Sequence, residues 1–161
     1  MRDRVFASKD KADLFIKLSR TRQKDSDSWL FDNNKDLFLF ALAIGWKHNK
    51  RHPLKKRDTE IPLSVFQKSS DNIDYIDLVA LGATKDVYIL DWDDEEKVEQ
   101  KLTIIEEFAN GGLSYLDDKL LNNSSGIYDN LLQLLDSELG NRKKGIDDFP
   151  DDLDDIVSLM D

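Results

Sequence analysis

The chain has 161 residues, a net charge of −10 and no cysteine. Its length suits one domain with a hydrophobic core, and the lack of cysteine excludes disulfides, cysteine-ligated zinc, iron–sulfur clusters and a thiol nucleophile. Residues 1–68 carry 16 Lys and Arg against 9 Asp and Glu, whereas residues 69–161 carry 7 against 24. An acidic chain with this asymmetry still offers a cationic surface, which is typical of proteins that meet phosphates or acidic partners.

The first predicted helix covers residues 8–20, and a polar loop follows at residues 21–28. A second helix begins at Asp32 or Asn33, which suit the N-cap, and ends where Gly45 suits the position after the last turn. Its apolar residues cover most of the circumference. We therefore expect this helix at the centre of the core.

A basic loop follows at residues 46–57, with six Lys and Arg, both histidines of the chain and no acidic residue. We expect this loop to be exposed. Residues 61–66 fit either a short strand or one helical turn, because Pro62 removes a backbone donor and restricts Ile61. We favour a turn that packs Phe66 inward.

Helical spacing returns between Ser70 or Asp71 and Leu81, and Gly82 is expected to end that helix. Residues 84–90 are ambiguous between strand and helix. The acidic residues 93–96 favour a helix start, because they meet the positive end of the helix dipole, and this helix continues to Phe108.

Residues 110–112, Asn-Gly-Gly, are expected to break the helix before it resumes at residues 113–121. A last helix covers residues 127–135 and is expected to end at Gly140, before the cationic residues 142–144. Residues 147–161 contain seven acidic residues and no base, a pattern typical of a disordered tail.

These elements predict a mainly α protein: a single compact helical domain at residues 1–144, with an exposed basic loop and an acidic tail at residues 145–161. No apolar stretch is long enough to span a membrane. We expect a cytoplasmic protein with no membrane partner.

Catalytic constellations are not evident in the sequence. His48 and His52 have the i, i+4 spacing of metal ligands, but the residues between them are Asn49, Lys50 and Arg51, and no carboxylate is near. The acidic residues 91–96 lack the order of a calcium loop and fit a solvated helix start. No phosphate-binding glycine loop or nucleophile elbow is present. We therefore expect no enzyme activity, metal or cofactor.

Two segments are candidates for binding. The basic loop could neutralise phosphates of a nucleic acid, or contact an acidic protein, although a solvated loop is the alternative. Its candidate contacts are Lys47, His48, Lys50, Arg51, His52, Lys55, Lys56 and Arg57. The tail would align Leu153, Ile156, Val157 and Met160 on one face if it became helical, and could then dock on a partner or on the basic loop. The alternative is a tail that only aids solubility.

Four stretches carry a resemblance to a known family: residues 35–47, residues 61–66 with Ile61, Pro62 and Phe66, residues 76–80, and residues 108–113. In order and combination they resemble the small Dnd-system-associated proteins, also described as DNA phosphorothioation-associated. The resemblance spans roughly residues 31–121 and includes no catalytic motif. It implies a prokaryotic accessory factor of a DNA modification or anti-phage defence system.

The leading hypothesis is therefore a non-enzymatic accessory protein whose partners are the proteins of such a DNA modification, restriction or defence complex, with non-specific DNA contact. A DNA-binding transcriptional regulator is the second hypothesis. The third is a divalent-metal nuclease that uses Asp91, Asp93 and Asp94.

Overall fold

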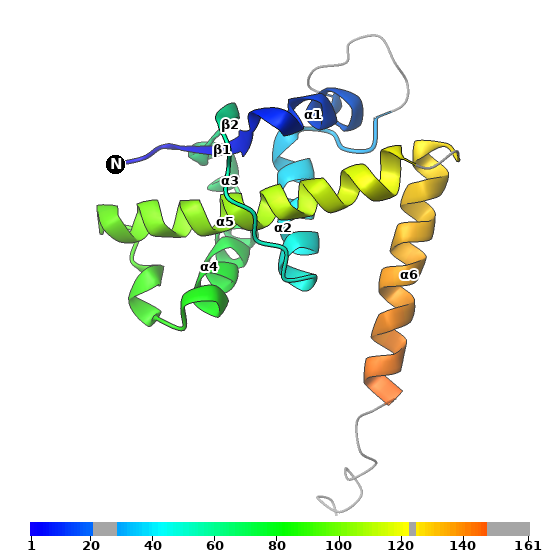
Figure 1. Ribbon diagram of the computed structural model, residues 1–161. Helices are drawn as coiled ribbons and strands as arrows, with labels where there is room; N and C mark the ends of the chain where they lie inside the picture. Colours follow the sequence, from blue (N-terminus) through cyan, green and yellow to red (C-terminus); the bar gives the residue numbers. More distant parts are fainter. Residues whose placement is uncertain (21–28, 123–124, 148–161) are drawn as a thin grey trace, which may run out of the picture. The chain divides into compact units, whose positions relative to one another are not determined.

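The computed structural model describes residues 1–20, 29–122 and 125–147, with side chains placed up to residue 140. Over these ranges the fold is mainly α, as predicted (Figure 1). Two compact units are present, residues 1–118 and residues 119–161. No helix in the described ranges is long and apolar enough to cross a membrane.

The first unit is built around α5 (Glu95–Leu116), which packs against α2, α4 and β1. Asp94 caps this helix, because its Oδ1 accepts hydrogen bonds from the amides of Glu96 (2.9 Å) and Lys97 (3.2 Å). Acidic residues in the first turn also meet the positive end of the helix dipole. The predicted start of this helix is confirmed.

α2 (Asn34–Lys47) crosses α5 and makes the largest contact in the unit (Figure 1). The side chain of Asn33 caps α2 by accepting from the amide of Asp36 at 2.9 Å. A Cβ atom on Gly45 would overlap the carbonyl oxygen of Phe108, and one on Gly112 would overlap the carbonyl oxygen of Ala41. The two helix backbones are therefore in direct contact at this crossing.

The predicted helix ends at glycines were wrong. Gly45, Gly82 and Gly140 all lie inside helices, and residues 110–112 continue α5 instead of breaking it. In the described ranges no glycine has a positive φ, so these positions do not need the freedom that ends a helix. A Cβ on Gly82 would meet the Trp46 ring at 2.7 Å, so close packing explains this glycine as it does Gly45. Nothing in the structure explains Gly140, which has no neighbour within 4 Å.

The helix predicted at residues 8–20 forms an α-helix only from Ala12, and the strand before it was not predicted. β1 (Arg4–Ser8) is a strand, followed by a 3₁₀ turn, η1 (Lys9–Lys11), and then by α1 (Ala12–Leu18). β1 pairs antiparallel with β2 (Arg57–Pro62), which brings Val5 opposite Ile61, with an irregularity between Phe6 and Ser8. Each strand buries only two or three side chains, which is too short an alternation to recognise.

The remaining elements of the first unit follow β2. Phe66 is fully buried at the end of α3 (Leu63–Phe66), which confirms the predicted turn, although β2 extends through Pro62. α4 (Ser70–Thr84) ends at Lys85, which adopts the left-handed conformation with φ 57°. The ambiguous stretch after it forms a 3₁₀ turn, η3 (Val87–Leu90).

A buried lysine joins α4 to α5. Lys101 is fully buried; its Nζ lies 2.6 Å from Asp77 Oδ1 and 3.7 Å from the centroid of the Trp92 ring. The indole Nε1 of Trp92 donates to Asp77 Oδ2 at 3.1 Å. A buried charge is tolerated only with such partners, so the three side chains hold the two helices in register.

The second unit contains α6 (Ile127–Asp147). The buried side chain of Asn130 donates to the carbonyl oxygens of Leu120 (3.0 Å) and Ser125 (3.2 Å), which fixes the turn before the helix. The predicted loop at residues 21–28 lies outside the described residues, and so do the tail positions Leu153, Ile156, Val157 and Met160. The division at residue 144 stays a prediction.

The contact between α2 and α5 predicts a strong effect of a single methyl group. Gly112→Ala should lower the free energy of unfolding by about 2 kcal/mol or more, because the added Cβ forces two backbones apart. Gly140→Ala, with open space around it, should instead raise it by about 0.5 kcal/mol through helix propensity. Urea unfolding followed by far-ultraviolet circular dichroism measures both, and a Gly112→Ala protein as stable as wild type would refute the contact.

Candidate functional site

The basic loop runs from the end of α2 to the start of β2 and passes across α5 (Figure 1). Lys47 is the last residue of α2, His48 caps that helix, and Arg57 is the first residue of β2. Most side chains of the loop are exposed, whereas His48 and Lys50 are partly covered.

Hydrogen bonds to α5 fix the backbone of this loop. The side-chain amide of Asn110 donates to the carbonyl oxygens of His52 and Pro53, both at 3.1 Å. The amide of His52 donates to the carbonyl oxygen of Glu107 at 3.0 Å. Gly111 leaves room for the carbonyl of Lys50, which a Cβ would overlap. The loop is therefore a fixed part of the fold.

Aromatic rings hold several of its cationic side chains. His48 stacks on Tyr115 with ring centroids 4.6 Å apart, and Lys50 Nζ lies 5.7 Å from the centroid of the same ring. The guanidinium of Arg51 lies over Phe108 and donates from Nε to Glu107 Oε2 at 2.6 Å. The side chains in this half of the loop already have partners within the unit.

Arg57 belongs to a second cluster, at the sheet. Its guanidinium and that of Arg2 both lie 5.2 Å from the centroid of the Phe6 ring. Both also reach Glu99 Oε1, Arg2 at 3.1 Å and Arg57 at 3.4 Å. Arg57 is thus held by one long ion pair, which a stronger anion can replace.

Lys55 and Lys56 are exposed and make no side-chain ion pair or hydrogen bond with any residue that the structure describes. The amide of Lys9 donates to the carbonyl oxygen of Lys56 at 2.7 Å, so a third exposed lysine, the first residue of η1, adjoins them. Asp10 is close: the hydrogen bond from Ser8 lowers its pKa, and the charges of Lys11 and Lys55 contribute. We call Lys9, Lys55 and Lys56 the lysine cluster.

Below the loop, α5 contributes the buried carboxylate of Glu106. It is paired with Arg2 and accepts from the amide of Phe6 at 2.6 Å, so it ties β1 to α5. Burial raises the pKa of Glu106 to about 7, although Arg2 and the Phe6 amide lower it. A cavity of about 270 Å³ separates Glu106 and Thr103 from the loop residues 53–57.

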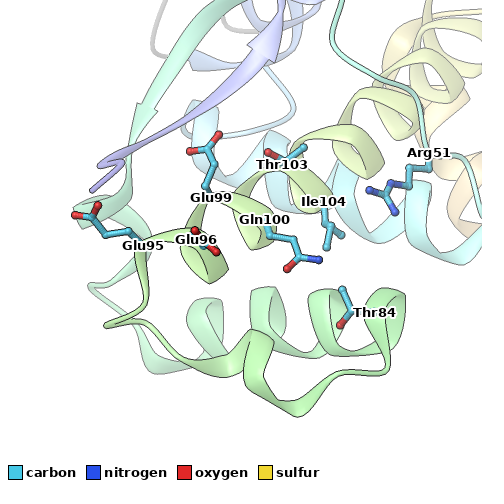
Figure 2. Close-up of a pocket in the computed structure, with 8 residues that line it drawn as sticks. All are labelled: Arg51, Thr84, Glu95, Glu96, Glu99, Gln100, Thr103 and Ile104. Atoms are coloured by element: carbon cyan, nitrogen blue, oxygen red, sulfur yellow. The ribbon is translucent and has the colours of Figure 1, made fainter.

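A larger groove of about 560 Å³ lies on the other side of Arg51. Figure 2 shows Arg51, Gln100, Ile104 and Thr84 around one space, with Glu96 beyond Gln100 along α5. Glu95, Glu99 and Thr103 complete its lining. Arg51 therefore belongs both to the basic loop and to this groove.

Two of the three carboxylates considered for a nuclease, those of Asp91 and Asp94, have other partners. Asp94 caps α5, and Asp91 accepts from the amide of Asp93 at 2.8 Å. Within the described ranges, no group of three or more Asp, Glu, His or Cys side chains gathers where it could hold a metal ion.

Several residues of this site were not evident from the sequence. Asn110 and Gly111 were interpreted as a helix break, yet they anchor the basic loop from within α5. Lys9 lies in η1, directly after β1, and the pairing of β1 with β2, which was not predicted, brings it to Lys56. Nothing in the local sequence signals that Tyr115 or Glu99 meets the basic loop.

These features define a small, mainly helical protein that presents cationic side chains from a loop fixed on its central helix. Residues 4–154 match the family described as DNA sulphur modification system-associated protein 4, and the chain belongs to this family. No curated protein and no solved structure matches the chain. The family match confirms the resemblance seen in residues 31–121 and extends it in both directions.

The anchoring by Asn110 predicts a local effect of its removal. Asn110→Ala deletes two hydrogen bonds, each worth about 1 kcal/mol, so the His52 amide should exchange with deuterium about tenfold faster or more. Asn130→Ala, which also deletes two side-chain hydrogen bonds to carbonyl oxygens, should leave the His52 amide unchanged. Equal exchange at His52 in both variants would refute the anchoring role.

The raised pKa of Glu106 predicts a pH dependence of stability. The carboxyl of Glu106 binds a proton more tightly in the folded protein, where its pKa is about 7, than in the unfolded chain, where it is 4.5. Protonation of Glu106 therefore stabilises the folded state. This stabilisation is fully present below pH 4.5 and is lost as the pH rises through about 7. From pH 5 to pH 8 the free energy of unfolding of wild type should fall by about 2 kcal/mol more than that of Glu106→Gln. Parallel pH profiles of the two proteins would contradict the buried assignment.

Proposed function

We propose that the protein is a non-enzymatic accessory subunit of a prokaryotic DNA modification or anti-phage defence system, and that its basic loop binds a polyanion. The favoured ligand is the phosphate backbone of DNA, and an acidic protein surface of the same complex is the alternative. The family match supports the accessory role, since the family's description names association with a DNA sulphur modification system.

One observation carries the binding proposal: the backbone of the basic loop is fixed to α5, whereas the lysine cluster at its end makes no ion pair in the part of the chain that the structure describes. A fixed backbone reduces the conformational entropy that a flexible loop loses on binding. Unpaired lysines can contact phosphates without first breaking an internal ion pair.

The aromatic contacts support different roles for the two halves of the loop: the first half attaches the loop to α5, and the second half contacts the ligand. His48 and Lys50 on Tyr115, and Arg51 on Phe108, hold the first half of the loop against α5. The lysine cluster and Arg57 then provide the contacts to the ligand. Contacts of this kind do not read base sequence, so we expect similar affinity for unrelated duplexes, whereas a transcriptional regulator would prefer one.

Charge reversal tests the proposal. Lys55→Glu with Lys56→Glu should weaken binding of a short DNA duplex by about tenfold or more at low salt, and should reduce the slope of log K against log salt by about 2. The double variant Lys17→Glu with Lys68→Glu makes the same charge change at exposed lysines outside the loop. Fluorescence anisotropy with a labelled duplex measures both.

Equal affinity losses in the two double variants would mean that only net charge matters, and would refute the lysine cluster as the site. No binding of any duplex by wild type at low salt would exclude DNA. In that case, a loss of co-purifying proteins of the native complex in the Lys55→Glu, Lys56→Glu variant would point to the acidic protein partner.

A further inference from the structure

The groove between α4 and α5 has a different charge at each end. At one end lie Glu95, Glu96 and Glu99 from the first turns of α5, and at the other lies Arg51 (Figure 2). Glu95 is paired with the N-terminal amine at 3.0 Å, and Glu99 is shared between Arg2 and Arg57. Glu96 has no ion pair among the described residues, so it is the carboxylate that a ligand can reach.

The middle of the groove is less polar. The lining there is Ile104, with the amide of Gln100 beside it and Thr84, at the end of α4, opposite (Figure 2). Aliphatic carbon at the centre and opposite charges at the ends favour a ligand with an apolar group between a cation and an anion.

The dimensions indicate the class of ligand. Glu96 and Ile104 are eight residues apart on α5, which corresponds to about 12 Å along a helix axis, and Arg51 lies beyond Ile104. A peptide chain in extended conformation covers this distance with about four residues. The acidic end opposes nucleic acid, whose phosphates it repels.

We propose that this groove binds a short segment of a partner protein, with a Lys or Arg side chain at Glu96, an apolar side chain over Ile104 and an acidic side chain at the terminal nitrogens of Arg51. The pair with Glu107 uses the Nε of Arg51 and leaves these two nitrogens for the ligand. This inference goes beyond polyanion binding and uses a different surface, although Arg51 borders both. The protein would then hold a partner protein by the groove and a polyanion by the lysine cluster.

A capped synthetic peptide, Lys-Leu-Thr-Leu-Glu, tests the groove on the full chain. Titration followed by amide chemical shifts should move the signals of Thr84, Gln100, Thr103 and Ile104 more than those of the lysine cluster. Glu96→Lys should weaken the peptide by about fivefold or more, because an attraction becomes a repulsion. The analogue with Gln in place of Lys should bind wild type more weakly than the original peptide does, but less weakly than the original peptide binds Glu96→Lys, because an attraction is lost and no repulsion replaces it.

Asp74→Lys provides the matched control, since Asp74 is an exposed acidic residue of α4 that does not line the groove. It should leave peptide binding unchanged, and so should Lys55→Glu with Lys56→Glu, which separates this proposal from the polyanion site. Glu96→Gln repeats the test with a milder change if Glu96→Lys alters the far-ultraviolet circular dichroism.

Three outcomes would overturn the proposal. The first is no shift at the groove residues at millimolar peptide, and the second is an equal loss of affinity in Glu96→Lys and Asp74→Lys. The third is a change of the same groove signals on dilution without peptide, which would assign the groove to a second copy of the chain.

Discussion

The structure depends on the place where α2 and α5 touch backbone to backbone. Gly45 and Gly112 allow the contact, because a Cβ atom at either position would overlap a carbonyl oxygen of the other helix. α2 ends shortly after Gly45, at Lys47, and the basic loop that begins there passes across α5 and is hydrogen-bonded to it. Next to this contact, Trp46 of α2 packs edge-on against Phe108 of α5, with ring centroids 5.1 Å apart, which adds a side-chain contact between the two helices. The position of the candidate site therefore follows from two glycines in the core.

The same short stretch of α5, residues 110–112, packs against α2 and anchors the basic loop. Gly112 contacts α2, Gly111 leaves room for the carbonyl of Lys50, and Asn110 donates to the loop beyond it. These residues belong to the stretches that carry the family resemblance, as does the end of α2 that they contact. In this chain these stretches form a helix crossing with an anchored loop, and the proposed binding of partners depends on that arrangement.

Much of the fold could be predicted from the sequence, because long elements have strong periodicity and capping. The start of α2 was predicted at Asp32 or Asn33 and the start of α5 at the acidic residues 93–96, and the structure has the caps at Asn33 and Asp94. The helix ends predicted at glycines were wrong because the sequence does not distinguish a glycine that ends a helix from one that lets a second backbone approach. The lysine cluster was predicted in part: Lys55 and Lys56 stand out as a charge run, whereas Lys9 reaches them only through the pairing of β1 with β2.

We propose that the basic loop binds its ligand because it is anchored to α5, and the affinity of Asn110→Ala for a DNA duplex at low salt tests this role of the anchor. The variant changes no charge and touches no ligand contact. If a fixed loop matters, its affinity should fall by about threefold to tenfold, since ordering the loop then costs free energy on binding, while Asn130→Ala binds as wild type does. If Asn110→Ala binds the duplex with wild-type affinity, the charge of the loop alone is enough for binding, and its anchoring to α5 does not contribute.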